Sequence, residues 1–267
     1  MYTTPFRYLR ATSVSEAEAL FGKSSDARFI AGGQTLIPTM KQRLAAPTDL
    51  IDIARIPSLT FIRCEDNALV IGAGTPHADV ASSDVVRKAL PALAALAGEI
   101  GDPAVRHRGT LGGSVANNDP AADYPAGVLA LGARLKTTKR KIPADEFFTG
   151  LFETALEPGE IITEISFPLP RRAGYAKFPN PASGYAMVGV FVADFPTSVR
   201  VAVTGAAPFV FRFVQMEATL SKNFSSDAIA GIAIPADGLN ADLFGSAEYR
   251  AHLVNVMAKR AIETAML

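Results

Sequence analysis

The interpretation of this chain depends on one stretch, residues 101–125, with the sequence GDPAVRHRGTLGGSVANNDPAADYP. It is rich in Gly, Asn, Asp and Pro, and it shows neither the 3.6-residue period of a helix nor the two-residue period of a strand. Loops of this length without structure of their own are usually functional or disordered. The closely spaced small residues favour a loop that folds around a ligand. We therefore expect 101–125 to be an irregular binding loop.

Two Gly-Gly turns have the composition of phosphate-binding segments. The first is Ala31-Gly32-Gly33-Gln34-Thr35, and the second is Gly109-Thr110-Leu111-Gly112-Gly113-Ser114 within the 101–125 stretch. Paired glycines let backbone N–H groups approach a ligand closely, and a following helix start adds unpaired donors. Neither turn has the P-loop or the Rossmann pattern, so a nucleotide held here needs another fold. From the residues alone, a pyrophosphate clasp and two plain structural turns remain equally open.

Outward from these turns, the first part of the chain alternates short strands with helices. Ser13 and Glu16 have capping-box spacing, which predicts a helix over 14–21. Further helices are predicted over 35–44, regular only from Pro38, and over 83–100, where Pro91 starts a second helix. Apolar, β-branched runs predict strands at 28–31, 50–53, 69–73, 134–138 and 161–167.

A second unit is predicted after a proline-rich linker. The sequence Pro168-Leu169-Pro170-Arg171-Arg172 places a domain boundary near residue 172. Beyond it we expect strands at 185–193 and 199–204, and helices at 216–220 and 246–265. A mixed sheet with helices on one side fits this pattern.

The composition excludes several classes of protein. Of 267 residues, 49% are hydrophobic and 19% are charged, which is enough apolar material for a core. Lys and Arg total 26, as do Asp and Glu, so no net charge attracts nucleic acid. No signal-peptide run is present, and no segment reaches the roughly 18 apolar residues of a membrane span. We expect a cytoplasmic protein with no transmembrane segment and no nucleic-acid partner.

Single residues give weaker signals. Asp102, Asp119 and Asp123 crowd the 101–125 stretch, but no histidine stands at ligand spacing, so no metal site is predicted. Asp123 is instead a candidate for ribose hydroxyls, as acidic residues are in other dinucleotide sites. His77 is the histidine of interest because it follows a Gly-rich turn at 72–76. Cys64 is the single cysteine, and we expect it to pack as a small hydrophobe.

Taken in order, these motifs make the chain similar to the FAD-binding medium subunits of molybdenum hydroxylases, the carbon monoxide dehydrogenase and xanthine dehydrogenase family. The resemblance covers nearly the whole length. The segments that carry it are 31–38 (AGGQTLIP), 71–79 (IGAGTPHAD), 101–114, 119–123 (DPAAD), 157–162 (EPGEII), 175–178 (YAKF) and 247–250 (AEYR).

The resemblance implies an α+β fold in two parts. Residues 1–172 would form an FAD-binding domain of the vanillyl-alcohol-oxidase (PCMH) type in two subdomains. Residues 173–267 would form a smaller α+β domain of the carbon monoxide dehydrogenase flavoprotein type, which completes the flavin site.

The resemblance also implies the cofactor-binding residues. Residues 32–36 and 110–114 would hold the pyrophosphate, Asp123 would contact the adenosine side, Ile162 and Lys177 would line the cleft, and Tyr185 would lie beside the isoalloxazine. The full implied set is Ala31, Gly32, Gly33, Gln34, Thr35, Leu36, His77, Gly101, Gly109, Thr110, Gly112, Gly113, Ser114, Asp123, Ile162, Lys177 and Tyr185.

The sequence departs from the family pattern in four places, one of which is a turn after Asp194 that is shorter than usual. Gln34-Thr35 stands where His-Ser or Asn-Thr is frequent, and this change preserves hydrogen bonding. Ser114 replaces a frequent Asn and so loses one amide contact. The segment FPNPAS, residues 178–183, differs from the usual basic stretch, so the surroundings of the flavin ring are the part of the site that the resemblance defines least.

The implied function is that of an electron-transferring subunit. FAD would take electrons from iron–sulfur clusters and pass them to a terminal acceptor, with no catalytic acid, base or nucleophile on this chain. One cysteine cannot ligate such clusters, so an iron–sulfur small subunit and a molybdopterin-binding large subunit are the implied partners, in a dimer of heterotrimers. The alternatives are a stand-alone FAD oxidoreductase of the same fold and a flavin-free scaffold.

Overall fold

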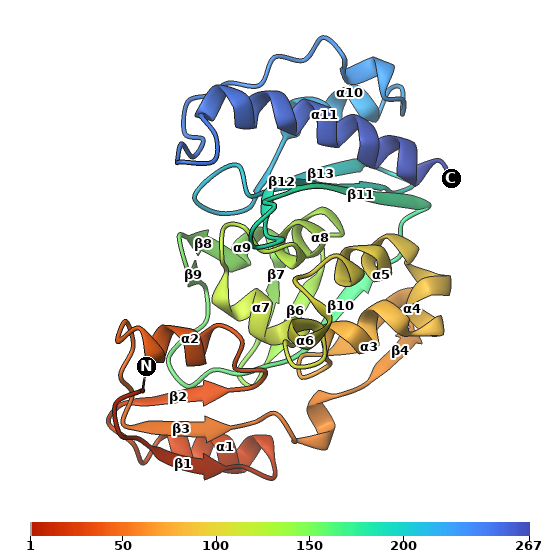
Figure 1. Ribbon diagram of the computed structural model, residues 1–267. Helices are drawn as coiled ribbons and strands as arrows, with labels where there is room; N and C mark the ends of the chain where they lie inside the picture. The colour runs from red at the N-terminus through yellow and green to blue at the C-terminus, as the bar shows by residue number, and fades with distance from the viewer. Residues whose placement is uncertain (1) are drawn as a thin grey trace.

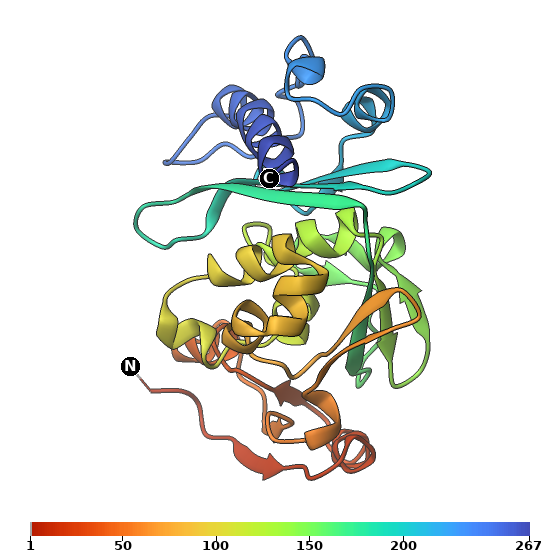
Figure 2. The same ribbon diagram turned by 90° about the vertical axis from the view of Figure 1, so that its right-hand side faces the viewer.

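The computed structural model describes residues 2–267 and has three layers, stacked from the N-terminal to the C-terminal end (Figures 1 and 2). The lowest layer is a small parallel sheet, the middle layer is a larger antiparallel sheet with helices, and the upper layer is a third sheet covered by two helices. This arrangement confirms the α+β class expected from the sequence.

The N-terminal layer is built on the parallel sheet β1-β3-β2. Its elements are β1 (Arg7–Arg10), α1 (Val14–Phe21), β2 (Ala27–Ile30), α2 (Leu36–Lys41), β3 (Asp49–Asp52) and the 3-10 helix η1 (Pro57–Leu59). The Ser13 cap predicted for α1 is present, because the Ser13 hydroxyl accepts from the Glu16 amide, but the Glu16 carboxylate accepts from the Thr12 amide, one residue before the position that a capping box uses. Helix α2 begins before Pro38 and is shorter than predicted.

The middle layer is the antiparallel sheet β4-β5-β10-β6-β7. Its strands are β4 (Ile62–Glu65), β5 (Ala68–Gly72), β6 (Arg134–Thr137), β7 (Lys141–Pro143) and β10 (Ile162–Pro168). Cys64 lies exposed on the edge strand β4, so the expectation that it packs as a small hydrophobe is wrong. The last two residues of β4, Cys64 and Glu65, are both exposed, because the strand leaves the core here and runs into the turn at Asp66 and Asn67.

Helices fill the segment between β5 and β6. They are α3 (His77–Ser82), α4 (Asp84–Ala89), α5 (Pro91–Gly98), α6 (Pro103–Arg106), α7 (Leu111–Asn117) and α8 (Tyr124–Ala130). Pro91 begins α5, as the sequence predicted. The prediction of an irregular loop over 101–125 is wrong, because α6 and α7 lie inside it. Both helices are too short, and α7 too rich in glycine, to show a helical period in the sequence.

A short excursion links the middle layer back to β10. It consists of α9 (Ala144–Phe147), β8 (Phe148–Gly150) and β9 (Glu153–Thr154), and β8 pairs with β9 as a hairpin. The buried side chain of Asn118, which ends α7, donates to the carbonyls of Gly150 and Glu153 at 2.8 and 2.7 Å. The hairpin is therefore fixed to the end of α7.

The C-terminal layer has a four-stranded sheet, β11-β12-β13-β14. Its elements are β11 (Arg172–Pro179), β12 (Ala186–Asp194), β13 (Val199–Thr204), β14 (Phe211–Arg212), α10 (Val214–Leu220), η2 (Asp227–Ile229) and α11 (Ala247–Ala265). All of its strand pairs are antiparallel, so the expectation of a mixed sheet is wrong. Helices α10 and α11 cover one face, as predicted (Figure 1).

The central strand β12 is buried along its whole length and divides two cores. Val188, Val190 and Val192 pack with α10 and α11 on one face. Phe191 and Ala193 point the other way, into the core of the middle layer with helices α5 and α8. This alternation follows from the two-residue period of a strand, and it joins the C-terminal sheet to the rest of the molecule.

Helix α11 approaches β11 so closely that only glycine fits at position 174. A Cβ added there would lie 2.8 Å from the amide nitrogen of Ala265 and in steric conflict with the carbonyl oxygen of Ala261. We predict that Gly174→Ala lowers the free energy of unfolding by about 3 kcal/mol, because the helix backbone must move away. Gly231→Ala is the matched control, since nothing lies within 4 Å of the added carbon. Urea unfolding tests both, and equal stability of the two variants would contradict the packing described.

Candidate functional site

The two Gly-Gly turns lie in direct contact, although some 75 residues separate them in the chain. A Cβ added at Gly32 would lie 2.7 Å from the Cα of Gly109 and would collide with the carbonyl oxygen of Arg108. The second turn is also joined to α3, because the His77 amide donates to the Gly109 carbonyl at 3.0 Å. Absence of a side chain at position 32 is thus what allows the turns to meet.

The first turn presents a run of unbonded amides. Within residues 2–267, no hydrogen bond engages the backbone N–H groups of 32–36, although the carbonyls of Gly33 and Thr35 accept bonds from α2. Gly33 has φ +73°, in the left-handed region that glycine adopts readily. Successive backbone N–H groups in such a turn form a concave site for anions. This turn therefore has the donors that a pyrophosphate requires.

The second turn differs from the first. Its amides are already bonded to protein, Leu111 to Thr75, Gly112 to Ala73, and Gly113 to the Thr110 hydroxyl. Gly112 is needed for this close packing, since an added Cβ would lie 2.5 Å from the Cβ of Ala73. The second turn consequently supplies shape and hydroxyl groups to the site, whereas the first supplies most of the amide donors.

A cavity of about 1440 Å³ lies over both turns. This exceeds the roughly 300–1,000 Å³ of most small-ligand pockets and suits an extended ligand. All of the predicted site residues except Lys177 line it, namely Ala31, Gly32, Gly33, Gln34, Thr35, Leu36, His77, Gly101, Gly109, Thr110, Gly112, Gly113, Ser114, Asp123, Ile162 and Tyr185. A free amide run and a cavity of this size fit a dinucleotide cofactor.

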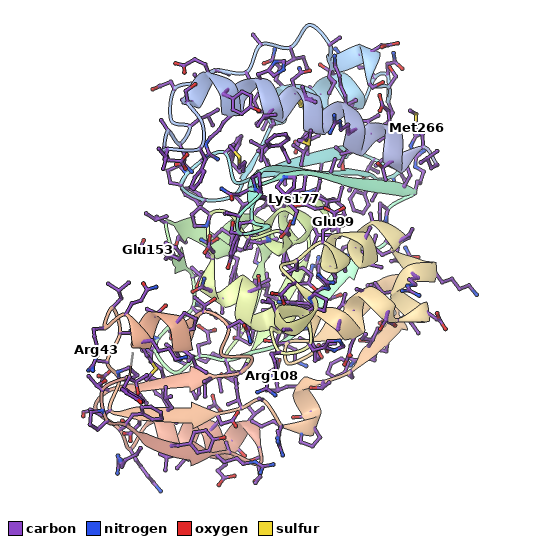
Figure 3. All side chains as sticks on the ribbon, in the orientation of Figure 1. Arg43, Glu99, Arg108, Glu153, Lys177 and Met266 are labelled. Carbon is purple, nitrogen blue, oxygen red and sulfur yellow. The ribbon has the colours of Figure 1, made fainter. Side chains whose placement is uncertain are left out.

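Lys177 does not line the cavity as expected, and it lies between the middle and upper layers (Figure 3). Its side chain is 4% exposed, and Nζ lies 2.7 Å from the Glu99 carbonyl oxygen, 3.0 Å from the Gly184 carbonyl oxygen and 3.0 Å from Oδ1 of Asp123. An ammonium group has three N–H donors, and all three are used. Lys177 therefore joins the end of α5, the start of α8 and the turn before Tyr185.

Asp123 is engaged by protein groups through one of its carboxylate oxygens, Oδ1. The Tyr175 hydroxyl donates to its Oδ1, and Gly189 leaves room for that hydroxyl, since an added Cβ would lie 2.6 Å away. Burial raises the pKa of Asp123, and Lys177 and Tyr175 oppose the rise. The expected contact between Asp123 and the adenosine side of the cofactor stays a prediction.

Tyr185 stands at the cavity with its side chain 46% exposed. In the turn before it, the Asn180 side chain accepts from the amides of Ala182 and Ser183, and Gly184 takes φ +72°. The following residue, Ala186, donates to the Ala121 carbonyl. Tyr185 is thus held against the 119–123 segment, and its place beside the isoalloxazine stays a prediction.

Comparison with known proteins agrees with this geometry. Residues 4–170 match the family model described as the FAD binding domain in molybdopterin dehydrogenase. The chain belongs to this family. FAD is accordingly its cofactor.

Relatives match over the full length. The carbon monoxide dehydrogenase medium chain of Hydrogenophaga pseudoflava is 39% identical over 97% of this chain and 96% of its own. The nicotine 6-hydroxylase medium subunit of Paenarthrobacter nicotinovorans is 36% identical over 96% and 95%. Among solved structures, carbon monoxide dehydrogenase from Oligotropha carboxidovorans has a TM-score of 0.89 at 32% identity and 99% coverage of both chains. These relatives are medium subunits of multi-subunit molybdenum hydroxylases.

Between residues 2 and 267, no group of three or more His, Cys, Asp and Glu side chains is placed to hold a metal ion. Over the same residues, no helix has the length and apolar character needed to cross a bilayer.

Sequence reasoning missed residues that shape the FAD site from elsewhere in the chain. Glu160, in the EPGEII motif, is buried and accepts hydrogen bonds from the Thr137 hydroxyl, the Arg140 guanidinium and the Glu157 amide. The motif contains two glutamates, Glu157 and Glu160, and this repetition could have identified Glu160 as a candidate site residue. Phe152 also lines the cavity, and no sequence pattern marked it.

His77 is held neutral in the FAD site. Its side chain is buried, Nδ1 has no partner within the described chain, and burial, with a smaller effect of Arg106, lowers its pKa from 6.5 to about 4. Because the unfolded chain takes up the proton first, His77 stabilises the fold above pH 6.5, and this contribution is lost as the pH falls toward 4.

We predict that the stability advantage of wild type over His77→Gln shrinks by about 3 kcal/mol between pH 7 and pH 4, at about 1.4 kcal/mol per pH unit. Comparing the variant with wild type cancels the carboxylates that titrate in the same range. Urea unfolding at a series of pH values measures the difference, and a constant difference would contradict a neutral buried imidazole.

Removing Lys177 should be costly because it leaves Asp123 buried without its partner. We predict that Lys177→Met lowers the free energy of unfolding by about 3–5 kcal/mol. Lys136→Met is the control, since Lys136 is 50% exposed and pairs with Glu164 at 3.4 Å, and exposed pairs contribute at most about 1 kcal/mol. Similar losses in both variants, measured by urea unfolding, would show that the Lys177 contacts contribute little.

Proposed function

We propose that this chain is the flavoprotein subunit of a molybdenum hydroxylase complex, in which FAD relays electrons from the iron–sulfur clusters of a partner to a terminal acceptor. The observation that carries the proposal is the contact between the two Gly-Gly turns, with the free amides of 32–36 facing a cavity of dinucleotide size. Bound FAD supplies the redox chemistry.

The residues of the chain bind and orient the cofactor. The amides of 32–36 and the hydroxyls of Thr35, Thr110 and Ser114 are the proposed pyrophosphate donors. The side chains of Gln34 and Thr35 are exposed and make no hydrogen bonds within residues 2–267, so they are free to contact a ligand. Tyr185 is proposed to lie beside the isoalloxazine. His77 stays neutral near neutral pH, so it adds no positive charge to the cavity.

The proposed partners are an iron–sulfur small subunit and a molybdopterin-binding large subunit, assembled as a dimer of heterotrimers. The chain has one cysteine, whereas iron–sulfur clusters need several thiolates. The full-length relatives named as medium chains of such complexes support this assignment. The cytoplasmic location stays a prediction, as does the division of the chain near residue 172, where three residues separate β10 from β11.

Purification tests the assignment directly. We expect the purified protein to absorb at about 375 and about 450 nm, as flavin does. We also expect cysteine-rich and molybdopterin-bearing chains to co-purify with it. A colourless chain that takes up no added FAD would favour a scaffold. Turnover of a small alcohol by the chain alone would favour a stand-alone oxidoreductase.

The glycine turns offer a sharper test. We predict that Gly113→Val abolishes FAD retention, because position 113 faces the cavity and an added Cβ would lie 2.8 Å from the Thr110 hydroxyl. Gly231→Val, in open space in the C-terminal layer, should keep its flavin. The measurement is the flavin-to-protein ratio of each variant as purified. Normal flavin content in Gly113→Val would contradict the assignment of this turn.

A further inference from the structure

Phe152, at the tip of the β8–β9 hairpin, combines three features that together indicate contact with the cofactor. Its backbone has φ +54°, in the left-handed region where bulky residues are uncommon. Glycine or asparagine normally occupies such positions because they adopt this conformation at little cost. A phenylalanine here makes the backbone less stable than a glycine would.

Burial within the protein does not offset this strain. The Phe152 side chain is 55% exposed, whereas Phe147, at the end of α9, and Phe148, at the start of β8, are buried in the core of the middle layer. Phe152 is instead one of the residues that line the cavity, together with Thr149, Glu153 and Thr154 of the same hairpin. Strained residues that persist without a packing role cluster at ligand-binding positions.

The hairpin is also held in a fixed position. Asn118 clamps the carbonyls of Gly150 and Glu153, on both sides of Phe152. Asn118 ends α7, the helix that begins with the second Gly-Gly turn, so the turn and Phe152 belong to one connected unit. Glu153, the residue after Phe152, is labelled in Figure 3 and marks the position of the hairpin.

We propose that Phe152 is a cofactor-contacting residue that packs its ring against a planar ring of FAD and covers it from solvent. The proposal rests on FAD occupying the cavity, as set out above. Aromatic rings prefer stacked or edge-to-face contact with other planar rings, and a half-exposed phenylalanine gains most when a ligand covers it. The contact would offset the backbone strain only in the FAD-bound state.

The test compares three variants of the full chain, in the assembly in which it is purified. Phe152→Ala removes the ring, and Phe152→Tyr keeps it. Leu151→Ala is the matched control, because Leu151 is 54% exposed in the same turn but does not line the cavity among the described residues. The flavin is removed, and FAD is titrated back while protein and flavin fluorescence are followed.

We expect Phe152→Ala to weaken FAD binding about tenfold, because it loses both the stacked aromatic pair and the apolar area that the ring buries. Phe152→Tyr and Leu151→Ala should bind within about twofold of wild type. The melting temperature of the flavin-free Phe152→Ala protein should not fall, which separates a binding role from a folding role. Equal FAD affinity in Phe152→Ala and wild type would overturn the proposal.

Iodide quenching of the bound flavin identifies which ring is covered. Greater quenching in Phe152→Ala than in wild type assigns the contact to the isoalloxazine, and unchanged quenching with weakened binding assigns it to the adenine. Both support the proposed contact. If wild type itself binds no FAD, the proposed function fails, whereas loss of the Phe152 effect alone leaves that function intact.

Discussion

The FAD site depends on the contact between Gly32 and the Arg108–Gly109 backbone. Any Cβ at position 32 would occupy the space of the Arg108 carbonyl oxygen, so the parallel N-terminal sheet and the helical part of the middle layer could not meet as they do. The same turn, with its unbonded amides at 32–36, lines the cavity. This single contact therefore determines both the geometry of the cofactor site and the packing of the two layers.

Lys177 has a comparable role at the opposite side of the cavity. A buried ammonium is unfavourable unless every donor is used, and here the three acceptors come from α5, α8 and the turn before Tyr185. The charge of Asp123 completes the arrangement, with Tyr175 fitted into the space above Gly189. These contacts hold Tyr185 in place, although the Lys177 side chain itself does not line the cavity.

The sequence defined much of this structure where local signals were strong. The Ser13 cap placed α1 correctly, the apolar run at 185–193 predicted β12, and the two glycine pairs identified the walls of the cavity. Helices α6 and α7 escaped prediction because they are too short for periodicity to be visible. The partners of Lys177 and the exposure of Cys64 depend on contacts with residues distant in the chain or on position within a sheet, which no local pattern encodes.

Strand β12 carries a consequence for how such a chain can be divided. One of its faces belongs to the core under α11 and the other to the core of the middle layer, so the linker near residue 172 separates two stretches of chain but not two independent cores. A C-terminal fragment cut there would expose Phe191 and Ala193 to water. If this unit were exchanged between related proteins, helices α5 and α8 would have to be exchanged with it, because they cover the second face of β12.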